Sequence, residues 1–367
     1  MIPTLYEAKT NNFSNNGLGG LPHAISCQVT EERHGQYFLE MEYPIGGLHF
    51  EDICCDRIIT APPAPGKAAQ PFIIRRVSRG IDGVAKVYAP HISRLLEERI
   101  SRTHQANYGS AGFSLMVNRI MNRSYPYNGG WDKFTGVSTS ATGSKELNII
   151  PPVATTMECI VGVEGSLVDL WGGEIEWDGF TIRHSERRGT DTGIKIEFGS
   201  NMLNIDAEVD MAGLVTGVVS YWQKDDVLVY CDYPKNASNA SQFGTVHCIA
   251  VDVTEDMGDY YTAENPPTQE QVAKYGQYFL NDTTRNELKT SIEIGVAPGA
   301  LPPFDLKPTP ERNVYLCDTV EVIHSGLKLR QTSKIVKCVF NVLTEKYESI
   351  TVGSIRKDIS DTIASLI

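Results

Sequence analysis

Apolar residues recur at every second position in several short segments, a spacing typical of strands with one buried face. In the first hundred residues these segments are 25–29, 39–43, 72–77 and 84–88. Polar connections at 32–36 and 79–83 separate them and suit hairpin turns, with Gly35 expected to supply a positive φ in the first. Short strands at this spacing predict a small β-barrel over residues 1–97.

Helical spacing replaces the alternation after Pro90. Apolar side chains in 91–104 and in 111–121 recur at intervals that place them on one face of a helix. We therefore expect two amphipathic helices, of which the first begins at the end of the barrel and the second lies within a helical or mixed insert over 98–180. A stretch rich in Gly, Ser, Thr and Pro follows at 125–152 and indicates a loop.

Strand patterns return in the second half of the chain and predict a second β-barrel assembled from 181–235 and 310–353. An inserted α/β domain is expected over 236–309. It contains a helix that begins near Thr268, and the expected buried stripe of this helix is Val272, Tyr275, Tyr278 and Phe279. Residues 354–367 have the spacing of a C-terminal helix. The predicted fold class is mainly β with α/β inserts.

Length and charge narrow the class of protein. A chain of 367 residues exceeds what one core usually organises, so at least two domains are expected. Its 45 acidic and 33 basic side chains give a net charge of -12, which argues against a surface that grips nucleic acid. No apolar run predicts a signal peptide or a membrane span. We interpret two arginine groups as solvated faces without a ligand: Arg94, Arg99 and Arg102, and Arg183, Arg187 and Arg188.

Eight scattered cysteines indicate reduced thiols rather than a disulfide framework. Cys27 and Cys338 occupy apolar strand positions and are expected to be buried. Cys159 and Cys248 are weak candidates for a nucleophile paired with a distant histidine. The sequence around both resembles apolar strands, so the buried-thiol interpretation is favoured.

Other catalytic and metal-binding signatures are missing from the sequence, including phosphate-binding loops, a nucleophile elbow and zinc motifs. Two acidic groups could hold a hard cation, although solvent-facing strand positions explain them better. They are Asp206, Glu208 and Asp210, and Asp178, Glu186 and Asp191. The glycines at 17–20 are best explained by a turn. We predict no catalytic, cofactor-binding or metal site.

Several segments together resemble the tail-hub family of siphophages and prophages, also called tail-associated proteins, phage minor structural proteins or prophage endopeptidase tail proteins. The most specific block is 163–178, which includes a Leu-Trp-Gly-Gly-Glu run at 170–174. The further segments are 16–19, 24–33, 39–44, 188–193, 198–202, 316–322 and 347–353. Cys317 departs from the family pattern, which favours glycine there.

Local chemistry in these blocks suggests a structural role. Gly172 and Gly173 permit a sharp turn between a helix end and a strand, and Gly189 and Gly193 are expected to bracket a tight hairpin. Such glycines fix the path of the backbone.

The resemblance implies a multi-domain tail-hub fold with two similar small β-barrels, similar to the baseplate hub of contractile tails. It further implies a homotrimeric ring at the tail tip of a virion, assembled in the cytoplasm of the bacterial host. The ring would dock on the distal tail protein and enclose a channel for the tape-measure protein and for DNA, which would pass without specific binding. Membrane insertion and enzymatic activity are not expected.

Two alternatives remain at this point. The family name suggests a peptidoglycan endopeptidase, which would need a Cys-His pair or a metal site. A carbohydrate receptor-binding module would need an exposed aromatic platform, for which Trp131, Tyr125 and Tyr127 are the candidates.

Overall fold

The structure is a computed structural model of the whole chain. It describes residues 1–101, 110–127, 130–138, 143–146, 154–163, 165–198, 202–211, 213–281, 289–296, 313–326 and 329–354. Two compact units divide the chain. Unit 1 comprises Met1–Asp206 and Ile292–Ile367, and unit 2 comprises Ala207–Ser291.

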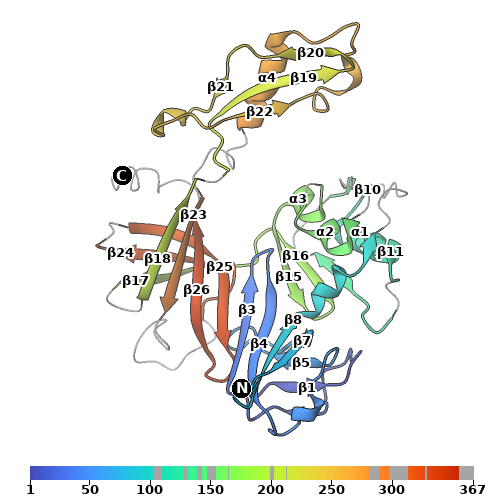
Figure 1. Cartoon of the computed structure of the whole chain (residues 1–367), viewed down its shortest axis with the longest axis vertical. Helices are drawn as coiled ribbons and strands as arrows, with labels where there is room; N and C mark the ends of the chain where they lie inside the picture. The colour runs from blue at the N-terminus through green and yellow to red at the C-terminus, as the bar shows by residue number, and fades with distance from the viewer. Residues whose placement is uncertain are drawn as a thin grey trace. The chain divides into compact units, whose positions relative to one another are not determined.

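A ten-stranded sheet dominates unit 1 (Figure 1). Its main path runs in the order β18-β23-β26-β25-β3-β4-β8-β7, and β24 pairs with both β25 and β17. The strands are β3 (Ser26–Glu32), β4 (Tyr37–Pro44), β7 (Arg76–Arg79), β8 (Val84–Pro90), β17 (Asp191–Glu197), β18 (Met202–Asp210), β23 (Lys289–Val296), β24 (Thr319–His324), β25 (Leu329–Asn341) and β26 (Lys346–Ser354).

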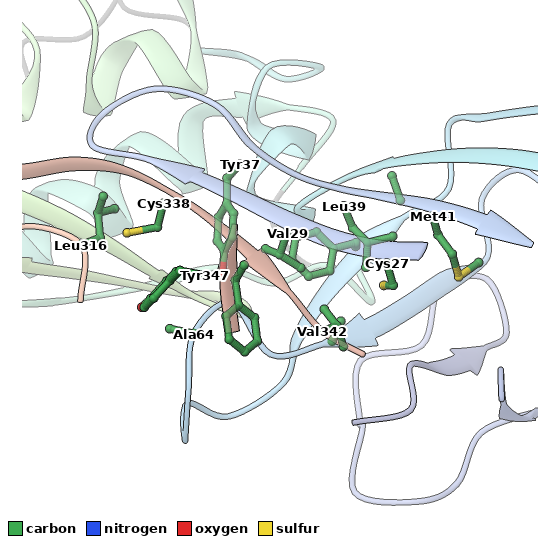
Figure 2. Close-up of a cluster of buried hydrophobic side chains, with 14 of the residues drawn as sticks. Cys27, Val29, Tyr37, Leu39, Met41, Ala64, Leu316, Cys338, Val342 and Tyr347 are labelled. Carbon is green, nitrogen blue, oxygen red and sulfur yellow. The ribbon is translucent and has the colours of Figure 1, made fainter. Parts of the chain in front are cut away.

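Strand alternation builds the first core. In β4, Leu39 and Met41 are buried while Glu40 between them is exposed, the pattern of a strand with one covered face. Val29 of β3 lies opposite Leu39 on one side and opposite Phe340 of β25 on the other. Figure 2 shows these early side chains packed with Cys338, Val342 and Tyr347 from the end of the chain. Segments more than 300 residues apart therefore share one core.

A second cluster in unit 1 is built from short elements. Its helices are η2 (Ile92–Leu96), α1 (Phe113–Arg123), α2 (Thr156–Ile160) and α3 (Leu167–Trp171). Its short strands are β9 (Ile100–Ser101), β10 (Ser110–Ala111), β11 (Ser124–Tyr125), β12 (Thr135–Ser138), β13 (Lys145–Glu146), β14 (Ala154–Thr155), β15 (Glu174–Asp178) and β16 (Thr181–Ser185). The buried face of α1 consists of Phe113, Met116, Val117, Ile120 and Met121, which confirms the amphipathic helix predicted there.

A four-stranded sheet completes unit 1. It contains β1 (Thr4–Tyr6), β2 (Gly19–Gly20), β5 (Ile58–Ala61) and β6 (Gln70–Ile73), with η1 (Phe50–Asp52) in the connection that precedes β5. Gly17 has a positive φ, and Gly19 and Gly20 pair with β1, so the glycines at 17–20 form a turn and a short strand.

Unit 2 is an α/β unit with its own core. Its elements are β19 (Gly217–Lys224), β20 (Val227–Tyr230), β21 (Lys235–Asn236), η4 (Ala240–Gln242), β22 (Cys248–Asp252), η5 (Gly258–Tyr260) and α4 (Gln269–Asn281). Trp222, Val251 and Val272 belong to one buried cluster, which joins β19 and β22 to α4. The predicted helix near 268 is confirmed, but Tyr278 is exposed rather than buried.

Mainly β architecture is confirmed, but the two similar barrels are not. Strand β3, from the predicted first barrel, pairs with β25, from the predicted second, in one continuous sheet. Within the described residues no sheet closes on itself. Each half satisfies the edge hydrogen bonds of the other, which removes two exposed strand edges.

In unit 2, which begins at Ala207, β19 and β20 share a core with β22 and α4. The predicted domain boundaries stay predictions. The C-terminal helix predicted at 354–367 lies outside the described residues, apart from Ser354 at the end of β26.

Two local predictions were wrong. The helix predicted at 91–104 is the short η2 followed by strand β9, and residues 102–104 lie outside the described part. In the β3–β4 turn, His34 rather than Gly35 has the positive φ, 54°. Histidine adopts this conformation more readily than most side chains. Among the helices that the structure describes, none is long and apolar enough to cross a membrane.

Candidate functional site: a charged junction at the sheet

Glu174 lies at the centre of a group of paired charges beside the sheet. It is the first residue of β15, and only 1% of it is exposed. Its Oε1 accepts a hydrogen bond from Lys334 Nζ at 2.7 Å and faces Arg33 Nε at 2.9 Å. Its Oε2 accepts from the backbone N–H of Arg188 at 2.7 Å. One carboxylate thus joins three segments that are far apart in the sequence.

Arg188 extends this group toward β3. Its Nη2 donates to Glu31 Oε1 at 2.8 Å and lies 3.8 Å from Glu176 Oε1. We call Glu31, Arg33, Glu174, Glu176, Arg188 and Lys334 the charged junction. Desolvation penalises isolated charges so strongly that buried charges in proteins are normally paired, as the buried Glu31 and Glu174 are here.

The junction keeps Glu174 and Arg188 ionised. Burial alone would raise the pKa of Glu174, but hydrogen bonds from Lys334 and the Arg188 backbone, together with nearby cations, lower that pKa below its ordinary value. Burial would likewise lower the pKa of Arg188, but Glu31 and Glu176 raise it above the ordinary value. Such compensated charges hold segments together and are poorly suited to proton transfer at neutral pH.

The loop that carries Arg188 is fixed from its other side by Asp318. The Asp318 Oδ1 accepts from the backbone N–H of Thr190 at 2.7 Å, and Oδ2 accepts from that of Tyr315 at 2.8 Å. Gly189 lies directly against the Cys317 carbonyl, where a Cβ would overlap backbone atoms. Cys317 itself has φ 73°, a left-handed conformation that favours glycine.

The predicted sharp turn after α3 is confirmed. Gly172 ends the helix with φ 66°, Gly173 follows with φ 77°, and β15 begins at Glu174. A Cβ on Gly173 would overlap the Ser185 carbonyl. The turn therefore places Glu174 where it meets its cationic partners.

The predicted hairpin between Gly189 and Gly193 is wrong. Gly189 lies in the β16–β17 loop, and Gly193 lies within β17, which pairs in parallel with β24. The register shifts between Asp191 and Lys195, so the positive φ of Gly193 belongs to a bulge.

The two arginine groups are engaged in ion pairs rather than forming plain solvated faces. Arg99 is 3% exposed and pairs with Asp132, while Arg94 donates to the Gly35 carbonyl. Further along the chain, Arg183 pairs with Asp178 at 2.8 Å. The predicted solvation is therefore wrong for Arg99 and for Arg188. Arg102 lies outside the described residues.

The two candidate nucleophiles, Cys159 and Cys248, differ in burial. Cys159 lies in α2, not in a strand, and is fully buried, which raises its pKa to about 12. It is therefore a protonated thiol at neutral pH, unsuited to nucleophilic attack. Cys248 in β22 is exposed, so the prediction that it is buried is wrong. Cys27 and Cys338 are buried as predicted.

The acidic candidates do not assemble into a metal site in the part of the chain that the structure describes, where no group of three or more suitable ligands occurs. Asp178 pairs with Arg183, and Asp191 with Arg187. Asp206, Glu208 and Asp210 belong to β18, but their side chains lie outside the described part.

The aromatic candidates for a carbohydrate platform differ in exposure. Tyr125 and Tyr127 are each about two-thirds exposed. Trp131 is half-buried and packs edge-on against Phe180, with 6.0 Å between ring centroids. Its indole is thus part of a core rather than of a free surface.

A cavity of about 500 Å³ lies beside the β3–β4 turn, β8 and η2, and it was not predicted from the sequence. Its charged walls are paired internally. Arg75 donates to Glu98 at 2.6 Å, and Arg94 donates to Glu97 at 2.5 Å. The sequence pattern did not predict the charged junction either. Its members Glu31, Arg33, Glu174 and Arg188 nevertheless all fall within the segments that carry the family resemblance.

No protein-family model and no curated protein matches this sequence. Solved structures do match its fold. Prophage tail protein gp18 from Listeria monocytogenes EGD-e is 14% identical, with a TM-score of 0.56 over 100% of this chain and 98% of that one. The 43 kDa tail protein of prophage MuSo2 from Shewanella oneidensis is 12% identical, with a TM-score of 0.62 over 99% of both chains.

A tail protein from Neisseria meningitidis MC58 is 10% identical, with a TM-score of 0.58 over 96% of each chain. The similarity spans nearly the full length of each protein, so it covers the fold of the chain rather than one common motif. This chain therefore has the fold of prophage tail proteins.

Proposed function

We propose that this chain is a structural subunit of the tail-tip or baseplate hub of a phage or prophage. The observation that carries the proposal is the full-length similarity to three prophage tail proteins. In this role three copies form a ring that closes or extends the tail tube and docks on the distal tail protein. The subunit acts through contacts with its neighbours rather than by catalysis, and it is a virion component assembled in the host cytoplasm.

The charged junction supports this role. A ring subunit must keep its interaction surfaces at fixed positions, and buried ion pairs between distant segments favour one arrangement of the sheet. A net charge of -12 also suits a ring around a DNA channel, because acidic walls repel phosphate and avoid salt bridges that would delay passage. The tape-measure protein would occupy the same channel before DNA.

Light scattering of the purified chain tests the ring. We expect a species of three times 40.5 kDa, and negative-stain images of closed rings with an open centre. Mixing with a distal tail protein of the same phage or prophage should give a larger, stable complex. A monomer at all concentrations, both alone and with that protein, would contradict the proposal. Retention of duplex DNA at physiological salt would contradict the acidic channel.

A further inference from the structure

Within the described residues of unit 2, the sheet has one face covered by a helix and one open face. Helix α4 covers the first, where Val218 and Trp222 of β19 are fully buried. Between them, Ser220 Oγ donates to the Val272 carbonyl of α4 at 2.9 Å. Since side chains alternate along a strand, Val219 and Tyr221 point to the opposite face.

Strand pairing extends this second face across three strands. Tyr230 of β20 lies opposite Tyr221, and Ala250 of β22 lies beside Val219. Leu228, two residues before Tyr230, points the same way. Leu228 is 53% exposed and Tyr230 is 50% exposed. We call Val219, Tyr221, Leu228, Tyr230 and Ala250 the open face.

An open sheet face in contact only with water is usually polar. This one carries five apolar or aromatic side chains next to the polar Gln223 and Asp252, and such an apolar patch is typical of a surface that another layer covers. The α4 side of the same sheet shows how that layer is made, because one amphipathic helix buries Val218 and Trp222.

Charge around the open face is acidic. Asp225 and Asp226 form the β19–β20 turn, and Asp252 of β22 lies beside Tyr221. The lysines described in unit 2 belong to the α4 side. Lys224 donates to the Tyr261 carbonyl, and Lys274 lies over the ring of Tyr278 in α4. Lys235 of β21 lies opposite Val218 of β19 in the strand pairing, so it shares the α4 side of the sheet.

We propose that the open face binds a basic amphipathic helix of a partner protein. Apolar side chains of that helix would cover Leu228, Tyr221 and Tyr230, and its lysines or arginines would lie near Asp225, Asp226 and Asp252. Complementary charge selects this occupant. A second copy would bring the same acidic rim to the face and be repelled, as would the phosphates of nucleic acid. The inference is independent of whether the chain forms a ring.

The test measures fluorescence anisotropy of a labelled 18-residue helical Leu/Lys peptide with the full chain. A Leu/Glu peptide with the same apolar spacing is the matched probe. We expect saturable binding of the Leu/Lys peptide only, weakened at least tenfold in L228S/Y230S and reduced by added salt. Tyr260→Ser removes an exposed tyrosine outside the open face and should leave binding unchanged.

Circular dichroism checks that the variants fold. Should L228S/Y230S unfold, Asp226→Lys provides a second variant in an exposed turn, and it should weaken binding at least threefold. Failure of the Leu/Lys peptide to bind overturns the proposal. So does equal binding by the folded variants, or equal binding of the two peptides. Self-association that L228S/Y230S abolishes would identify a second copy as the occupant and also overturn it.

Discussion

Arg188 donates to Glu31 at 2.8 Å, although 157 positions separate them in the chain. Glu31 belongs to β3 at the start of the sequence, and Arg188 to the loop before β17. A buried ion pair adds little net stability compared with apolar residues, but removing one partner leaves an uncompensated buried charge. The pair therefore matters chiefly because it allows only one arrangement of the two segments.

Replacing Arg188 by Met should lower the free energy of unfolding by about 3–5 kcal/mol, because Glu31 then stays buried without its cation. Urea unfolding followed by far-UV circular dichroism measures the loss. Arg187→Met is the matched control. Arg187 pairs with Asp191, whose side chain is 73% exposed, and loss of such a surface pair should cost about 1 kcal/mol or less. Equal losses in the two variants would contradict the role of the junction.

His34 should make stability depend on pH. Burial lowers its pKa from 6.5 to about 4, and the positive charge of Arg33 adds to this effect. The unfolded chain therefore binds more protons than the folded chain between these values, so stability falls as the pH is lowered from about 6.5 to about 4. After a discount for the partial exposure of the ring, this group should account for about 2 kcal/mol of that fall.

His34→Asn tests this dependence, because asparagine tolerates the left-handed backbone at this position. Urea midpoints are measured from pH 8 to pH 4. The variant should lose less stability than the original chain as the pH falls. Parallel profiles would show that His34 does not titrate as its burial requires.

Cys317 offers a comparison of backbone and side-chain effects. Cys317→Gly loses a buried thiol but relieves a φ of 73°, so the two effects should nearly cancel, to within about 1 kcal/mol. Cys338→Gly loses a similar thiol from the extended strand β25 and gains nothing from the backbone, so a loss of about 2 kcal/mol or more is expected. Thermal unfolding of both variants checks the difference, and equal losses would contradict this account.

Thiol accessibility tests whether Cys159 can act as a nucleophile. Cys54, Cys55 and Cys248 are exposed, whereas the other five cysteines are buried. A chromogenic disulfide reagent should therefore modify three thiols quickly in the native protein and eight in denaturant. Peptide mapping identifies them. Rapid modification of Cys159 in the folded chain would reopen the endopeptidase alternative.

Local periodicity predicted most of the regular elements. The alternation of Cys27, Val29, Leu39 and Met41 indicated β3 and β4, because each strand buries one face. The helical spacing in 91–104 failed for another reason. Ile92 and Leu96 are buried in η2, but Ile100 belongs to β9. That strand pairs through Ser101 with Ser124 of β11 and Ala154 of β14, which lie far along the chain. Pairing with distant strands overrode the local preference.

The charged junction could not be predicted from local pattern. Arg188 sits beside Arg187 in the sequence, yet one is buried and the other faces solvent, because the turn at Gly189 packs against Cys317. The prediction of two barrels was not confirmed for a similar reason. Alternation identifies strands but not their partners, and the pairing of β3 with β25 depends on the order of strands in the whole sheet.

Gly276 in α4 provides a test in which two effects oppose each other. Alanine in place of glycine within a helix normally stabilises by about 1 kcal/mol. Here, however, the new Cβ would lie 2.6 Å from Ser220 Oγ and 3.0 Å from Ser220 Cβ, in the packed contact between α4 and β19. Overpacking of this kind costs about 1–3 kcal/mol, and Ser220 Oγ is held by its bond to the Val272 carbonyl.

We therefore expect Gly276→Ala to destabilise unit 2 by about 1–2 kcal/mol. The loss is measured as a lower urea midpoint in the fluorescence of Trp222, with the other tryptophans replaced. Gly244→Ala, where a Cβ meets open space, should leave that midpoint unchanged. A stabilised Gly276→Ala variant would mean that α4 moves away from the sheet at little cost, and that the contact between them is looser than the buried Val218 and Trp222 indicate.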